Sequence, residues 1–217
     1  MNRIFSAIIV FCCSASVFGQ SLTVSVTSNE GEPIPGAVIE ILLPDELKSA
    51  YGETTSNQVD QIDKEFVPTI TTAVAGSQIS FPNSDDILHH VYSFSPAKTF
   101  NIPLYGRREN NDFVETFETP GVVEIGCNIH DWMLAYIYIG ETSLVAISDD
   151  SGIAQLDSLP EGEFELSIWH PRLAESSGST QTITVTGTAS LDLQIELELV
   201  RDRRVRRAPS ANRNRYR

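Results

Sequence analysis

The sequence predicts an all-β protein, because apolar and polar residues alternate along it and turn signals interrupt it often. Leu22, Val24 and Val26 alternate with polar residues, which is the period of a strand with one buried face. A second alternating run near the end comprises Leu191, Leu193, Ile195, Leu197 and Leu199. Turn-forming residues at 30–33, 149–152 and 160–162 separate such runs. A short helix is expected only near residues 45–51.

Residues 1–19 are expected to be a cleaved secretory signal. Arg3 provides a positive start, residues 4–11 are apolar, and Val17, Phe18 and Gly19 precede a cleavage point at Gln20. No later stretch approaches the roughly 20 apolar residues that a membrane-spanning helix needs. We therefore expect a periplasmic protein without a membrane span.

Charge is divided unevenly along the chain. Residues 20–200 contain 28 acidic and 6 basic residues, whereas residues 201–217 contain eight arginines and one aspartate. The low apolar content of residues 201–217 predicts a disordered, arginine-rich tail. Such a tail is first expected to be a solvated end; the alternatives are binding to an acidic redox partner, to lipopolysaccharide or to the acidic body of its own chain, and export argues against nucleic acid.

The residue types at Cys127, His130 and Met133 predict a metal site. They lie in the run GCNIHDWM, and an upstream segment offers His89 and His90. One thiolate, two imidazoles and one thioether are the ligands of a mononuclear type 1 (blue) copper centre. Zinc accepts the same sulfur and nitrogen donors, but the thioether favours copper.

Export of the protein would strengthen the prediction that Cys127 binds a metal. Removal of residues 1–19 would also remove Cys12 and Cys13, so Cys127 would have no partner for a disulfide within its own chain. Adjacent strand residues point to opposite faces, so His89 and His90 cannot both point into one site. From the residues alone, either histidine remains a candidate.

Residues 59–140 resemble a cupredoxin, a plastocyanin-like or amicyanin-like copper domain. The runs that carry the resemblance are EFVPTITTAVAGSQISFPNSD, HHV and FETPGVVEIGCNIHDWM. The resemblance implies a Greek-key β-sandwich with His89, Cys127, His130 and Met133 as copper ligands. It selects His89 because the first ligand of the family lies two residues before the valine. Ile129 stands where the family usually has proline, and His90 where asparagine is common.

The flanks resemble a second β-sandwich of the transthyretin-like or carboxypeptidase-regulatory-like type. The runs NEGEPIPGAVIEI and DDSGIAQLDSLPEGEFELSIWHPRL carry this resemblance. It assigns residues 20–58 to the first strands and residues 141–200 to the remainder of that sandwich, with the copper domain inserted between them. Two consecutive domains are the alternative. The wider chain also resembles proteins labelled methylamine utilization proteins, through SFPNSDDILHHVYSFSPAK and GCNIHDWM.

These resemblances imply a carrier of single electrons rather than an enzyme. The expected partners are redox proteins such as a cytochrome or a dehydrogenase. Oxygen or nitrite chemistry needs a second copper with an open position, and a chain with four histidines leaves too few for one. The alternative is a copper-binding or structural module, such as a copper carrier or a docking protein, without a role in electron transfer.

Overall fold

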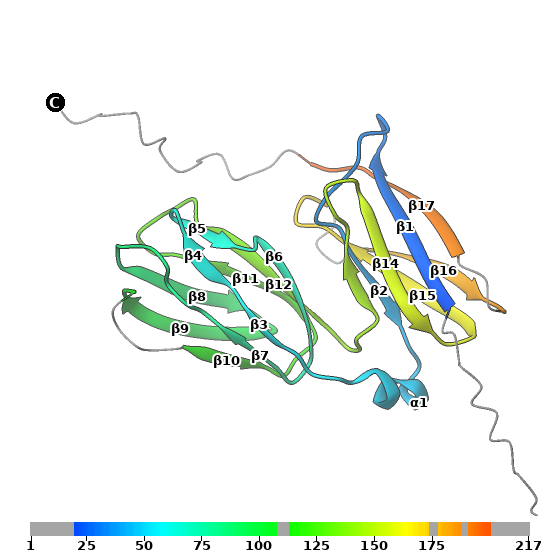
Figure 1. Cartoon of the computed structure of the whole chain (residues 1–217), viewed down its shortest axis with the longest axis horizontal. Coiled ribbons are helices and arrows are strands. Elements are labelled where there is room, and N and C mark those ends of the chain that lie inside the picture. Colours follow the sequence, from blue (N-terminus) through cyan, green and yellow to red (C-terminus); the bar gives the residue numbers. More distant parts are fainter. Residues whose placement is uncertain (1–19, 108–112, 174–177, 188–190, 201–217) are drawn as a thin grey trace, which may run out of the picture.

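The computed structural model describes residues 20–107, 113–173, 178–187 and 191–200. It shows an all-β protein, as the sequence predicts, with two groups of strands lying side by side (Figure 1). The expected signal at residues 1–19 and the tail at 201–217 lie outside the described residues. Within the described part of the chain, no helix has the length and apolar character needed to cross a membrane.

The first group of strands, here called the outer sandwich, is built from both ends of the described chain. Its strands are β1 (Gln20–Ser28), β2 (Val38–Leu42), β13 (Val145–Ile147), β14 (Ile153–Leu159), β15 (Gly162–Trp169), β16 (Ser179–Val185) and β17 (Leu191–Leu197). One sheet has the order β14-β1-β17 and the other the order β13-β2-β15-β16. The alternating residues Leu22, Val24 and Val26 are buried between these sheets, together with Ile195 and Leu197.

The second group, here called the inner unit, contains the strands between β2 and β13. They are β3 (Ser56–Gln58), β4 (Asp60–Ile62), β5 (Glu65–Val67), β6 (Ile70–Val74), β7 (Ser77–Ser80), β8 (His89–Ser95), β9 (Lys98–Tyr105), β10 (Val114–Phe117), β11 (Gly121–Gly126) and β12 (Leu134–Gly140). A five-stranded sheet, β6-β12-β11-β8-β9, faces a three-stranded sheet, β10-β7-β3, while β4 and β5 form a separate hairpin. The inner unit has its own hydrophobic core.

The strands on either side of the inner unit pair with each other. β2 pairs with β13 and β15, and β1 pairs with β14 and β17. The chain therefore leaves the outer sandwich after β2 and returns to it at β13. Strand β3 pairs with β7 and so belongs to the inner unit. From the sequence, these residues, 56–58, are expected to belong to the outer sandwich. Between β2 and β3 lie the helix α1 (Asp45–Lys48) and the 3-10 turn η1 (Ser49–Tyr51), which confirms the short helix expected there.

Aromatic side chains join the inner unit to the outer sandwich. Tyr136 and Tyr138 project from β12, and their ring centroids lie 5.5 and 5.9 Å from that of Trp169 on β15. Directly after β12, Glu141 forms an ion pair with Lys48 of α1, with 2.7 Å between Oε2 of Glu141 and Nζ of Lys48. Strand β12 therefore contacts the outer sandwich through Tyr136 and Tyr138, and the same strand begins directly after Met133.

Candidate metal centre

The predicted ligands converge at one end of the five-stranded sheet of the inner unit. His89 begins β8, Cys127 follows β11, and His130 and Met133 lie in the loop that leads to β12. Strand β11 lies between the other two, and Gly126, at its end, is paired with both neighbouring strands. Two segments that are distant in sequence, the start of β8 and the loop between β11 and β12, thus reach the same place because the strands are adjacent.

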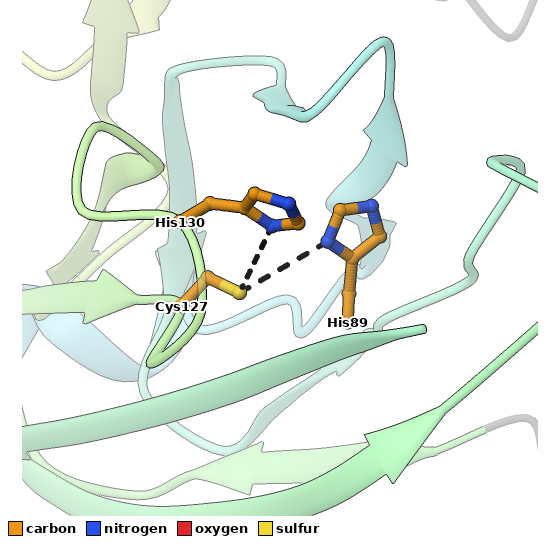
Figure 2. A group of neighbouring side chains, drawn as sticks. All are labelled: His89, Cys127 and His130. Carbon is orange, nitrogen blue, oxygen red and sulfur yellow. Dashed lines mark hydrogen bonds between the residues drawn. The ribbon is translucent and has the colours of Figure 1, made fainter. Parts of the chain in front are cut away.

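The sulfur of Cys127 lies between two imidazole rings. Its Sγ atom is 4.0 Å from Nδ1 of His89 and 3.7 Å from Nδ1 of His130, and both rings turn these nitrogens toward it (Figure 2). The three ligand atoms all lie within 4.8 Å of one another. A metal bound at about 2.3 Å from sulfur and about 2.1 Å from nitrogen would place such atoms less than about 4.4 Å apart. Both sulfur–nitrogen distances therefore fit a shared ion.

His89 and His90 have opposite environments. The side chain of His89 is fully buried and faces Cys127, whereas His90 is half-buried and its ring lies against Tyr92, with centroids 5.3 Å apart. This follows from the alternation of side chains along β8. The structure brings His89, and not the His90 ring, to the cluster. His90 contributes through its backbone N–H, whose hydrogen bond to the Cys127 sulfur lowers the pKa of that thiol.

The surroundings of Cys127 favour the thiolate. Burial of Cys127 raises the pKa of its thiol, but hydrogen bonds from His89 and from backbone N–H groups of His90, Ile129 and His130 outweigh burial and lower it. A thiolate is the form that binds metals. Cys127 is also the free cysteine that the structure describes, so no disulfide competes for it there.

Asp85 fixes the orientation of the His89 ring. Its Oδ2 atom lies 2.6 Å from Nε2 of His89, on the side of the ring away from Cys127. Asp85 can thus keep a proton on Nε2, so that Nδ1 is free to bind a metal once the proton that it shares with the Cys127 sulfur has left. Burial lowers the pKa of His89, but Cys127 and Asp85 outweigh burial and raise it. The same ion pair lowers the pKa of Asp85 against the effect of burial.

The loop that carries His130 and Met133 is closed by its own backbone. Met133 N–H donates to the carbonyl oxygen of His130 at 2.9 Å, and Cys127 N–H donates to the carbonyl oxygen of Met133 at 3.3 Å. Met133 is buried in the same hydrophobic cluster as Cys127. Burial, followed by the positive charges of His89 and Lys64, lowers the pKa of His130 and favours its neutral, metal-binding form.

Sequence reasoning did not identify two groups that surround this cluster. One is Asp85, although the Asn-x-Asp turn that contains it precedes His89 in the resemblance to cupredoxins. The other is the turn at Asp63 and Lys64, whose backbone contacts Asp85. No local pattern connects that turn with a histidine more than twenty residues later, because the contact depends on the three-dimensional fold.

No family model and no curated protein matches the chain. Among solved structures, a purple cupredoxin from Nitrosopumilus maritimus is similar to 39% of this chain, over 99% of its own length, at 20% identity and a TM-score of 0.35. Amicyanin from Paracoccus versutus is similar to 47% of the chain, over 97% of its own length, at 14% identity and a TM-score of 0.35. A copper-containing nitrite reductase from Thermus scotoductus SA-01 is similar to 41% of the chain at 22% identity and a TM-score of 0.37, and the match spans only 23% of that enzyme. These likenesses are partial, so the assignment of the site depends on its own geometry.

Proposed function

We propose that the protein is a type 1 copper protein that carries single electrons between redox partners. The observation that supports this most directly is the position of Cys127 Sγ between the Nδ1 atoms of His89 and His130. A copper ion bound there would supply one-electron exchange between Cu(II) and Cu(I). Met133 is the proposed fourth ligand, since a thioether commonly completes a His₂Cys copper site.

The residues around the site suit electron transfer better than catalysis. His89 is fully buried, and a substrate would have to pass the half-buried His130 to reach the cluster. Beside His130, the side chain of Ile129 is 48% exposed, so an apolar surface lies where a partner could approach the ring. We propose that electrons enter and leave at this edge, and that the rigid strands β8, β11 and β12 limit the movement of the ligands.

Copper loading of the purified protein tests the proposal. Addition of Cu(II) to metal-free protein should produce an intense thiolate-to-copper absorption band near about 600 nm, together with a reversible one-electron wave. The band should be lost in Cys127→Ser and in His89→Ala. His90→Ala is the matched control and should retain the band, because its ring lies on the other face of β8. A stoichiometric copper complex of the wild type without this band would reject the proposal.

The same experiment separates electron transfer from the two alternatives. A copper carrier or docking module would bind copper but release it readily to a chelator, and it would not cycle reversibly. A zinc site would also take up Cu²⁺, because most sites of this kind bind Cu²⁺ more tightly than Zn²⁺, but its copper complex would lack the intense band and the reversible one-electron wave. A type 1 site should retain its copper against the chelator, show both signals and exchange electrons rapidly with a small redox protein such as a cytochrome.

Location and partners complete the proposal. The signal-like residues 1–19 support export to the periplasm, which amino-terminal sequencing of protein from the periplasmic fraction would test by finding Gln20 first. The eight arginines of residues 201–217 support binding to an acidic partner. Truncation at Val200 should weaken binding to an acidic redox protein at low salt, while the copper spectrum stays unchanged.

A further inference from the structure

The hairpin of β4 and β5 ends in a turn of two left-handed residues. Asp63 and Lys64 connect Ile62 to Glu65, and their φ angles are 54° and 63°. Two consecutive positive φ angles define the tight hairpin turn that usually contains Asn and Gly. Neither residue here is glycine, so the conformation is maintained by contacts around the turn as well as by its own preference.

One side of this turn holds Asp85. The backbone N–H of Asp63 donates to Oδ1 at 2.7 Å, and that of Lys64 donates to Oδ2 at 2.9 Å. Successive N–H groups in such a conformation form a concavity that binds an anion. The anion in this case is the carboxylate that contacts Nε2 of His89. The turn therefore fixes the group that orients the first histidine.

The other side of the turn holds Trp132. The indole Nε1–H of Trp132 donates to the carbonyl oxygen of Lys64 at 3.0 Å. The Trp132 ring contacts that of His130, with centroids 5.2 Å apart. A continuous series of contacts thus runs from His89 through Asp85, the turn and Trp132 to His130.

We propose that the Asp63–Lys64 turn is a strap that fixes His89 and His130 relative to each other, through Asp85 on one side and Trp132 on the other. Asp85, Lys64 and Trp132 are then positioning residues. The proposal rests on the proposed function only in treating the two histidines as ligands. Without the strap, β8 and the loop before β12 would still share the contact between the His89 and His130 rings, whose centroids lie 4.9 Å apart, and the contacts made across Cys127 and the sheet.

Two substitutions at Lys64 separate the effect of the turn's backbone conformation from the effect of the Lys64 charge. Lys64→Gly and Lys64→Val both remove the ammonium group and keep the backbone N–H. Glycine adopts a positive φ freely, whereas valine, being β-branched, strongly disfavours it. In metal-free protein, the Trp132 indole N–H and the Met133 amide should exchange at least about tenfold faster in Lys64→Val than in Lys64→Gly. Equal exchange rates in the two folded variants would overturn the strap.

A double-mutant cycle provides a second test if Lys64→Val does not fold. Asp85→Asn removes one of the two carboxylate oxygens that accept hydrogen bonds from the turn. Trp132→Phe removes the indole donor and keeps a ring beside His130. If both act through one strap, their effects on the copper reduction potential and on the electron-spin-resonance spectrum should be non-additive. Additive effects would show that the two residues act independently and would overturn the proposal.

The two sets of outcomes keep this inference apart from the proposed function. The exchange measurement uses metal-free protein, so it can support or reject the strap even if copper loading yields no blue band. Conversely, a normal blue band in the wild type with additive effects in the cycle would reject the strap and leave the electron-transfer proposal intact.

Discussion

The hydroxyl of Tyr138 in the inner unit donates a hydrogen bond of 2.7 Å to the Oε2 atom of Glu40 in the outer sandwich. The other oxygen of Glu40 accepts from the backbone N–H of Glu141 at 2.8 Å. Glu40 is only 4% exposed, so this carboxyl group is buried at the junction of the two groups of strands. Burial raises its pKa, against the effects of the two hydrogen bonds and of Lys48, while the nearby Glu141 charge raises it further.

Glu40 should make the stability of the junction depend on pH. A raised folded-state pKa means that the group favours folding most below its unfolded value, near 4.5, and that this contribution is lost as pH rises through the folded pKa. Glu40→Gln keeps the shape and cannot ionise. Its melting temperature relative to wild type should therefore increase between pH 4 and pH 7, measured on metal-free protein by calorimetry. Glu141→Gln is the control for the neighbouring charge, and a pH-independent difference for Glu40→Gln would contradict this account.

A side chain at Gly126 should press against the ring of Tyr92. A Cβ atom at this position would lie 3.1 Å from the hydroxyl oxygen of Tyr92 and 3.2 Å from its Cζ atom. Gly126→Ala should therefore displace the Tyr92 ring and destabilise the protein by about 1–3 kcal/mol, as overpacking does. Denaturant unfolding measures this cost. In a Tyr92→Ala background the clash is absent, so Gly126→Ala should there cost less stability than it does in the wild type. Equal costs in the two backgrounds would contradict the steric explanation.

Ser148 should stabilise the outer sandwich through two buried hydrogen bonds. Its hydroxyl donates to the carbonyl oxygen of Ile34 and accepts from the N–H of Ala37, both at 2.8 Å. Ser148→Ala leaves both backbone groups without this partner, so we expect a loss of about 1–3 kcal/mol in the free energy of unfolding. Ser151→Ala, at an exposed position on the same loop, should change it by less than about 0.5 kcal/mol. Equal effects of the two substitutions would contradict the assignment.

Met133→Leu should separate the packing role of Met133 from its proposed role as a ligand. Leucine conserves the volume of the buried side chain, so the metal-free protein should lose less than about 1.5 kcal/mol of stability. In the copper-loaded protein the blue band should persist, because the thiolate remains, but the reduction potential should shift, since a thioether ligand would tune it. Voltammetry measures the shift. An unchanged potential would show that the Met133 sulfur does not contact the metal.

The sequence was most informative where the local pattern decides the structure. The alternation of Leu22, Val24 and Val26 predicted one buried face of β1, and all three residues are buried. The spacing from Cys127 to His130 placed both residues in one loop, and the structure brings their side chains together. These features depend on residues close in sequence, so a short window contains the information.

Contacts between distant segments could not be predicted in the same way. Glu40 lies in the strand VIEIL, where an isolated carboxylate is typical of an exposed position, yet it is buried by Tyr138 from another unit. The left-handed turn at Asp63 and Lys64 has no glycine or asparagine to mark it. In both cases the conformation or burial depends on tertiary partners, which a single sequence does not reveal.

The pairing of β2 with β13 brings the entrance and exit of the inner unit together, since Ile41 N–H donates to the carbonyl oxygen of Leu144 at 3.0 Å. A short hairpin linker could therefore replace the whole inner unit and leave the remaining strands in register. The part of the chain that contains the candidate metal centre is thus an insertion, and the outer sandwich could lose or exchange it without a change in its own strand order.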